Sequence, residues 1–191
     1  LHPGVPEEKR GTVAALAETV VVDHLRKLGV DTLELMPLTA WIDERHLAQQ
    51  GLSNAWGYNP VCFLAPDPRL APGGLAEVRS TVAALHRAGI RVILDVVFYH
   101  SGESDKFGAT LSLRGLDSAL YYRHRNGELV NDTGCGNTLA LDRAPVVQLA
   151  MDSMRSWVNR TGIDGFRFDL APVMGRSDDG FDVNAPLLAA I

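Results

Sequence analysis

The 191-residue sequence has an ordinary globular composition, with 46% hydrophobic residues and three tryptophans. Eighteen basic and 23 acidic residues give a net charge of −5, and no basic cluster could follow a phosphate backbone, so we expect no nucleic-acid partner. The first ten residues lack an apolar core, and no apolar run approaches the roughly 20 residues of a membrane span. We therefore expect neither a signal peptide nor a membrane segment.

The two cysteines, Cys62 and Cys135, are far apart in the chain and form no CxxC pair. Such sparse use predicts no disulfide framework and favours a cytoplasmic protein. Cys62 stands between Val61 and Phe63, and this apolar setting predicts a small buried thiol.

Three successive segments each combine an amphipathic helix, a glycine stop and a short apolar strand. Helical spacing of apolar residues defines the helices, and glycine and proline mark their ends. A fourth helix is expected to begin near Ala185. The predicted pairs of helix and strand are, in chain order, 13–28 with 32–36, 75–85 with 91–97, and 145–158 with 165–170.

Repeated helix–strand units with apolar strands predict an α/β fold with a parallel sheet. The turns from helix to strand are short, whereas the strand-to-helix connections run to roughly 37 residues after Met36 and roughly 46 after Val97. Long loops on that side are typical of the C-terminal face of a TIM barrel, where active sites are built. A doubly wound nucleotide-binding sheet would need a glycine-rich turn directly after a strand, and none of the three strands has one.

We therefore expect a partial (β/α)8 TIM barrel that contains about strands 2–4 with their helices and long βα loops. A complete barrel needs about 250 residues. The range 1–191 is accordingly predicted to be a fragment of a catalytic domain, with loop insertions at about 37–73 and 98–143.

The third predicted strand carries an arginine and an aspartate on one face. Arg167 and Asp169 are two residues apart and point to the same side, while Phe166 and Phe168 point to the other. A purely structural ion pair is one interpretation. The alternative is catalytic, because an adjacent arginine keeps a carboxylate ionised, as an attacking or cation-stabilising carboxylate requires.

Two further groups fall at strand ends or in the long loops. Asp95 lies near the end of the second strand and His100 just beyond it, which favours a site shared with the Arg167–Asp169 pair. The segment 56–60, Trp-Gly-Tyr-Asn-Pro, offers two aromatic rings whose faces suit the C–H side of a pyranose. Ordinary structural hydrogen bonding and loop packing are the alternatives for these residues.

Segment 95–100, DVVFYH, resembles the first signature of the α-amylase superfamily, a strand-end Asp followed five residues later by a His. Segment 165–171, GFRFDLA, resembles the second signature, which contains the nucleophile. The resemblance covers nearly the whole chain. Segments similar to the isoamylase and bacterial glycogen-debranching branch are 5–12, 56–60, 131–139 and 152–158.

The resemblance implies a role for each of five residues. Asp169 corresponds to the nucleophile that forms a covalent glycosyl-enzyme, and Arg167 to the residue that orients it. His100 corresponds to a hydrogen-bond donor to the glucose at the cleavage subsite, Asp95 to a support residue of the same pocket, and Tyr58 to the ring that stacks on that glucose.

One position departs from the signature, because Tyr99 stands where the residue before the histidine is usually Asn. That Asn can contribute to calcium binding in relatives, so the change weakens any prediction of calcium. We expect no cofactor and no metal.

The activity implied is retaining hydrolysis of α-1,6 branch links in glycogen-type glucans. The alternatives are an α-1,4-glucan hydrolase or a trehalose-releasing hydrolase of the same superfamily, and a non-catalytic carbohydrate-binding or structural half-barrel. Retaining hydrolysis needs a second carboxyl group as general acid, which this family places as a Glu on the fifth strand. After Asp169 the sequence contains no Glu and no His, so we expect the isolated chain to be inactive.

Overall fold

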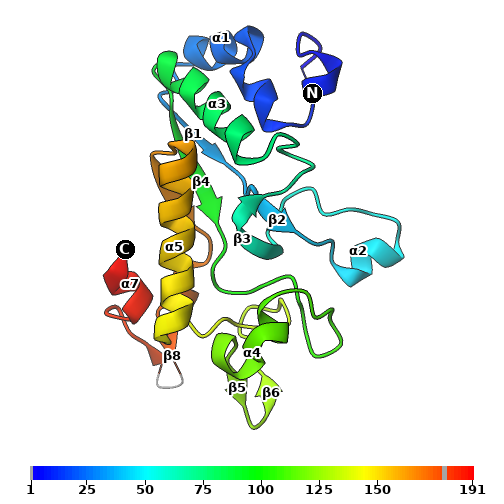
Figure 1. Cartoon of the computed structure of the whole chain (residues 1–191), viewed down its shortest axis with the longest axis vertical. Coiled ribbons are helices and arrows are strands. Elements are labelled where there is room, and N and C mark those ends of the chain that lie inside the picture. The colour runs from blue at the N-terminus through cyan, green and yellow to red at the C-terminus, as the bar shows by residue number, and fades with distance from the viewer. Residues whose placement is uncertain (1, 178–179) are drawn as a thin grey trace.

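A three-stranded parallel sheet runs through the centre of the computed structural model, which describes residues 2–177 and 180–191 (Figure 1). The strand order is β1–β4–β7, and both strand pairs are parallel. The predicted α/β class with a parallel sheet is confirmed. The three strands are β1 (Thr32–Leu35), β4 (Arg91–Val96) and β7 (Gly165–Phe168).

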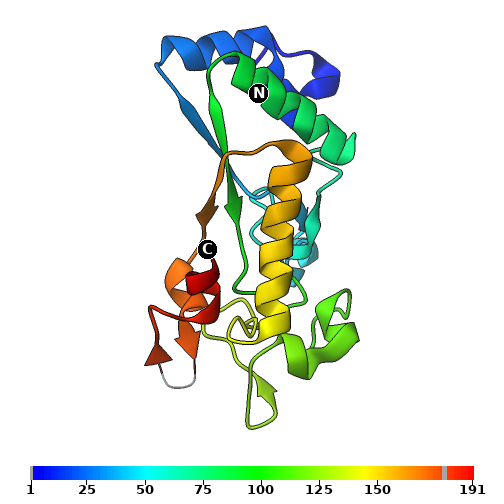
Figure 2. The ribbon, with the colours of Figure 1, turned by 60° about the vertical axis from the view of Figure 1, so that its left-hand side comes forward.

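Two long helices connect the strands and cover the sheet. Helix α3 (Gly74–Arg87) precedes β4, and α5 (Ala144–Thr161) precedes β7 and runs alongside β4 (Figure 2). Pro145 occupies the first turn of α5, where its missing N–H leaves no bond unmade, and Gly162 ends the helix in the left-handed conformation, with φ 80°. Both helices and the central strand contribute fully buried residues to one core: Val78, Val82, Leu85, Val92, Leu94, Val96, Val146, Ala150 and Trp157.

The predicted N-terminal helix over 13–28 is wrong as a single element. The structure has two 3-10 turns, η1 (Glu7–Lys9) and η2 (Val13–Ala17), followed by α1 (Thr19–Lys27). Glu18 separates η2 from α1 with an extended backbone, ψ 137°, and its carboxylate binds the Lys9 ammonium at 2.5 Å. The buried Val13 is tied to another segment by its N–H, so tertiary contacts override the continuous helical pattern.

The segment between β1 and α3 has its own small structure. It contains β2 (Thr39–Trp41), α2 (Arg45–Gln49) and β3 (Pro60–Pro66), and the two strands pair antiparallel. The predicted burial of Cys62 is wrong, because side chains alternate along β3 and this alternation buries Phe63 and leaves Cys62 exposed.

The segment after β4 forms the end of the molecule opposite α1 and α3 (Figure 1). It contains helix α4 and the strand pair β5–β6, and the chain closes with short elements that follow β7. Among the described residues, no helix combines the length and the hydropathy that crossing a bilayer requires. The remaining elements are α4 (Leu113–Tyr121), β5 (His124–Arg125), β6 (Glu128–Leu129), α6 (Ala171–Met174), β8 (Arg176–Ser177), β9 (Gly180–Phe181) and α7 (Pro186–Ala190).

Candidate active site

Polar side chains meet where β4 and β7 end. The strand register pairs Asp95 with Arg167, and the Asp169 N–H donates to the Val96 carbonyl at 3.1 Å, which continues the pairing one residue beyond β7. Because parallel strands end at the same sheet edge, Asp95, Arg167 and Asp169 share one location. The predicted same-face arrangement of Arg167 and Asp169 agrees with their direct contact.

Arg167 bridges the two carboxylates through a single nitrogen. Its Nη1 donates to Asp95 Oδ1 at 3.1 Å, to Asp95 Oδ2 at 2.9 Å and to Asp169 Oδ1 at 2.7 Å. The Tyr58 hydroxyl donates to Asp95 Oδ2 at 2.5 Å. The side chain of Asp95 is 2% exposed and that of Asp169 is 18% exposed. Asp95 is therefore the buried anchor, and Asp169 is the carboxylate that faces outward.

The charges at this site follow from these contacts. Hydrogen bonds to Asp169 and Asp95 raise the pKa of Arg167, so the guanidinium stays charged. Burial, supported by the bond to Asp95, raises the pKa of Tyr58 to about 12. Tyr58 is therefore a neutral donor at physiological pH, and its ring is held by its hydroxyl.

His100 lies just beyond β4 and is almost completely buried. Burial lowers its pKa to about 4, so the imidazole is neutral near pH 7. Its Nδ1 has no hydrogen-bond partner in the described part of the chain. The Nδ1 atom is itself covered by protein, so a ligand would meet the part of the neutral ring that lines the adjoining cavity.

A cavity of about 900 Å³ adjoins this network, and both Tyr58 and His100 line it. Its other walls come from segment 42–49, from the loop after His100 and from segment 131–136. An exposed aromatic ring, Phe107, stands in the wall contributed by that loop. The mixture of aromatic and polar side chains fits a carbohydrate better than a purely apolar ligand.

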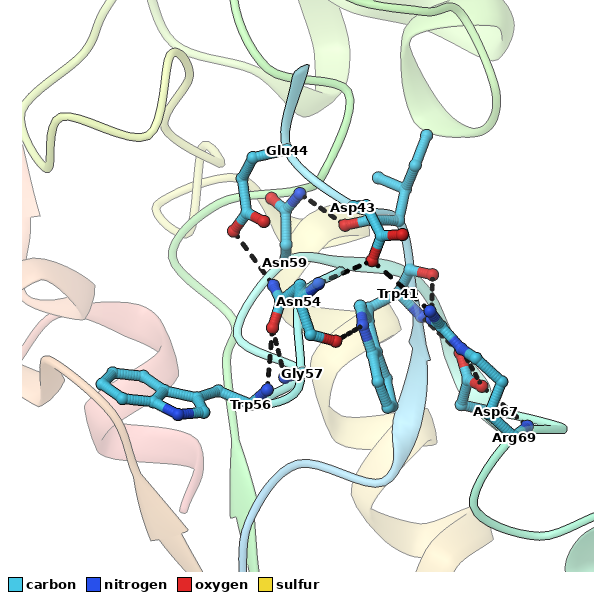
Figure 3. A network of polar contacts seen from close by, with 10 residues as sticks. Trp41, Asp43, Glu44, Asn54, Trp56, Gly57, Asn59, Asp67 and Arg69 are labelled. Atoms are coloured by element: carbon cyan, nitrogen blue, oxygen red, sulfur yellow. Dashed lines mark hydrogen bonds and ion pairs between the residues drawn. The ribbon is translucent and has the colours of Figure 1, made fainter. Parts of the chain in front are cut away.

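A polar network built around Asn54 holds the loop that carries Tyr58 (Figure 3). The Asn54 carboxamide oxygen accepts the backbone N–H groups of Trp56 and Gly57 at 2.8 and 3.0 Å. The backbone carbonyl of Asn54 accepts the Trp41 indole N–H at 3.0 Å. The Asn54 N–H donates to Asp43 at 2.9 Å. The Trp56 ring points away from the network and is exposed (Figure 3).

Gly57 sets the path of the backbone immediately before Tyr58. Its φ is +83°, a left-handed backbone conformation that residues with a side chain rarely adopt. A Cβ here would lie 2.9 Å from the Pro37 carbonyl oxygen and 3.3 Å from the Trp41 ring. Glycine is thus required both by conformation and by space.

The backbone on the other side of the site is also unusual. Leu170, directly after Asp169, has φ +46° and ψ +41°, and it caps the short helix α6. A left-handed leucine costs of order 1 kcal/mol and persists only where neighbouring contacts impose it. Asp169 and Leu170 therefore form a turn between β7 and α6.

The structure brings all five predicted site residues into one place. Arg167 contacts Asp95 and Asp169, Tyr58 contacts Asp95, and His100 shares the cavity with Tyr58. Their individual roles are not tested by this geometry and stay predictions. Across residues 2–177 and 180–191, no group of three or more His, Cys, Asp or Glu side chains is placed to hold a metal ion.

Sequence reasoning missed two features. The Tyr99 hydroxyl donates to Asp169 Oδ2 at 2.9 Å. Glu103, within the loop after His100, is fully buried and accepts the Leu111 N–H at 2.8 Å. The departure of Tyr99 from the signature was a usable indication for the first. For Glu103, the indication is a carboxylate only ten residues before a helix whose free N–H groups need acceptors.

Comparisons with known proteins agree on one family of enzymes. The chain is 52% identical over its whole length to a glycogen debranching enzyme of Yersinia enterocolitica and 51% identical to one of Yersinia pestis. It spans about 30% of the length of these curated relatives. No family model matches the chain.

Solved structures of pullulanases have a similar fold. The pullulanase of Paenibacillus barengoltzii, in complex with maltohexaose and α-cyclodextrin, matches with a TM-score of 0.76 and 27% identity, over 90% of this chain and 29% of that one. The type I pullulanase of Bacillus subtilis, with maltose, matches with a TM-score of 0.70 and 29% identity, over 90% and 26%. The resemblance to the debranching branch of the α-amylase superfamily is thus confirmed: this chain is homologous to a segment of glycogen debranching enzymes.

Proposed function

We propose that this chain is part of the catalytic domain of a retaining glycosidase that cleaves α-1,6 branch links in glycogen-type glucans. The observation that carries the proposal is the position of Asp169, an outward-facing carboxylate held by Arg167 at the edge of a parallel sheet. Two kinds of relative support the substrate class, since one is named for glycogen debranching and the other binds maltooligosaccharides.

In this proposal β1, β4 and β7 are strands 2–4 of a (β/α)8 barrel, and the segments 37–73 and 98–143 are the loop insertions of its catalytic face. The parallel order β1–β4–β7, with α3 and α5 between the strands, supports this assignment. The clustering of Asp95, Arg167 and Asp169 at the carboxyl ends of two strands supports it as well.

The proposed reaction has two steps. A carboxylate oxygen of Asp169 attacks the anomeric carbon, the bond to the leaving oxygen breaks, and a general acid donates a proton to that oxygen. Water then hydrolyses the glycosyl ester and releases Asp169. Tyr58 would stack on the sugar ring, His100 would hydrogen-bond to it, and Arg167 would hold Asp169 in position.

The general acid is proposed to come from outside these 191 residues. Asp95 is the carboxyl group joined to Asp169 through Arg167, but it is 2% exposed and already accepts bonds from Arg167 and Tyr58. It cannot approach a leaving oxygen. Retaining enzymes place the acid about 5–5.5 Å from the nucleophile and leave it free to protonate the leaving oxygen. Asp95 is excluded by its burial and its existing bonds, since both of its oxygens already accept from Arg167.

Substitution of Asp169 in the full-length enzyme tests the proposal. Asp169→Asn keeps the size of the side chain, so we expect an unchanged melting temperature and a loss of more than about 10³-fold in release of linear chains from glycogen. Linear amylose and trehalose-terminated glucans, assayed in parallel, separate the debranching activity from the α-1,4-acting and trehalose-releasing alternatives. Near-wild-type turnover of the variant would remove Asp169 as nucleophile, and glucan binding without turnover by the wild type would favour the binding-protein alternative.

A further inference from the structure

Tyr99 lies against the proposed nucleophile. Its hydroxyl donates to Asp169 Oδ2 at 2.9 Å, while Arg167 donates to Asp169 Oδ1 at 2.7 Å. Each oxygen of the carboxylate therefore has one donor. The usual residue at this signature position, Asn, has a shorter side chain, so this contact depends on the reach of the phenol.

Several segments hold the Tyr99 ring in place. The ring packs with Val97 and Val173 in a small buried cluster that Tyr58 and Cys135 adjoin. The Tyr99 carbonyl accepts the Leu139 N–H at 2.8 Å, which fixes the backbone from the opposite side. Only 4% of the residue is exposed. The direction of the hydroxyl is therefore determined by packing and does not depend on Asp169.

Two donors restrict a carboxylate more than one donor does. The terminal torsion of an aspartate is broad and roughly two-fold, so a single bond from Arg167 leaves the carboxylate plane free to rock. A second bond to Oδ2 from a rigid ring fixes that plane. Each oxygen can accept two hydrogen bonds, so Oδ2 keeps a lone pair for attack.

We propose that Tyr99 is a positioning residue of this enzyme, whose hydroxyl fixes the plane of the Asp169 carboxylate for attack on the sugar. This inference rests on the proposed function of Asp169. The tyrosine that replaces the usual Asn of the signature would thus take part in the nucleophilic step. Positioning of a reacting group within a few tenths of an ångström contributes to the rate but not to substrate affinity, so the effect belongs in kcat.

The surroundings of Asp169 keep Tyr99 a donor. Burial, with the bond to Asp169, raises the pKa of Tyr99, so the phenol is neutral. Burial likewise raises the pKa of the Cys135 thiol and lowers that of His100 to about 4, so both face the site uncharged. Arg167 supplies positive charge, and Asp95 behind it is the second carboxylate.

Tyr99→Phe in the full-length enzyme tests the proposal, because it removes the hydroxyl and keeps the ring. We expect kcat on glycogen to fall about 10-fold to 100-fold, the range expected for one hydrogen bond to a charged group, with KM changed less than about two-fold. Tyr99→Asn restores the signature residue and should show the same loss of kcat.

Tyr122→Phe is the matched control, since Tyr122 also donates to a buried carboxylate, that of Glu103, but away from Asp169. Its kcat and KM on glycogen should stay at the wild-type values. Wild-type kcat in Tyr99→Phe or in Tyr99→Asn overturns the proposal, as does a rise in KM as large as the fall in kcat. If Asp169→Asn is inactive in the same preparation, such a result rejects only the positioning role of Tyr99. If Asp169→Asn is active, the proposed role of Asp169 as nucleophile is rejected as well.

Discussion

Two carboxylates near the end of β4 are held in opposite ways. Glu103 is fully buried, and its two oxygens accept the N–H groups of Leu111, Ser112 and Arg114 at 2.8–2.9 Å and the hydroxyl of Tyr122. Arg114 lies in the first turn of α4, Ser112 is its N-cap and Leu111 directly precedes that cap. The carboxylate therefore sits at a helix start, which has free donors and favours a negative charge. These four bonds fill the acceptor positions of the carboxylate, which number about four.

Asp169 is held by two bonds, one from Arg167 and one from Tyr99, and 18% of its side chain is exposed. Half of its acceptor capacity is therefore open toward solvent or ligand. A saturated buried carboxylate is a structural anchor, whereas an unsaturated one at a sheet edge is available for chemistry. The two carboxylates thus differ both in burial and in the number of open acceptor positions.

The largest expected effect comes from removing the saturated carboxylate. Glu103→Ala leaves buried donors unpaired at the start of α4, and we expect a loss of about 3–5 kcal/mol in local stability. Amide hydrogen exchange at Leu111, Ser112 and Arg114 in the full-length protein measures this directly. Asp169→Asn serves as the control, with unchanged exchange at these amides. Equal protection in Glu103→Ala would mean that the helix start does not depend on this carboxylate.

The pH dependence of stability gives a second test of the same contrast. Burial alone would raise the pKa of Glu103, but the bonds from Tyr122 and three backbone N–H groups outweigh it and lower the pKa. A depressed folded-state pKa contributes stability above the unfolded value of about 4.3, and this stability is lost as the pH falls through the folded value. The gap in unfolding free energy between wild type and Glu103→Gln should be constant above about pH 5 and narrow below about pH 4.3. A gap independent of pH down to pH 3 would contradict the assignment.

Local patterns in the sequence were sufficient for the sheet and for one half of the site. Strand alternation alone placed Arg167 and Asp169 on one face, and the apolar strands between glycine stops gave β1, β4 and β7 to within two residues at each end. The position of Asp95 and His100 at the end of a strand indicated a shared site, and the resemblance to a known family then implied a role for each. These features depend on spacing within one element, which the sequence displays directly.

Contacts between distant segments could not be predicted in the same way. The bond from Tyr58 to Asp95 joins residues 37 apart, and that from Tyr99 to Asp169 joins residues 70 apart. Both depend on loop conformation and on the reach of a phenol, neither of which has a periodic pattern. The error at Cys62 has the same origin. Apolar neighbours in the sequence do not show which face of β3 packs against the rest of the protein.

A smaller loss of stability is expected when the hydroxyl that donates to Glu103, that of Tyr122, is removed. The Tyr122 hydroxyl contacts both Glu103 and Ser101, whose oxygen lies 2.6 Å away. Tyr122→Phe should therefore lower the unfolding free energy by about 1.5–3 kcal/mol while kcat stays at the wild-type value. Tyr99→Phe should show the reverse pattern, with kcat reduced and stability nearly unchanged. Denaturant titrations and steady-state kinetics on both variants measure these two effects. If both variants lose stability and kcat to the same extent, the two networks do not have separate roles.

The smallest effect separates the position of Tyr58 from general loop stability. Gly57 and Gly51 lie in the same loop with φ +83° and +68°, so alanine at either costs about 1 kcal/mol of conformational strain. A Cβ at Gly51 meets nothing within 4 Å, whereas one at Gly57 would lie 2.9 Å from the Pro37 carbonyl oxygen. Gly57→Ala must shift the backbone beside Tyr58, and we expect a several-fold rise in KM for glycogen and an extra loss of about 1 kcal/mol in stability relative to Gly51→Ala. Gly51→Ala should keep the wild-type KM. The Glu103 carboxylate bonds to Tyr122 and to the start of α4, so hydrogen exchange at the start of α4 should be the same in both variants. Equal KM values would show that the path of the chain at Gly57 does not govern the placement of Tyr58.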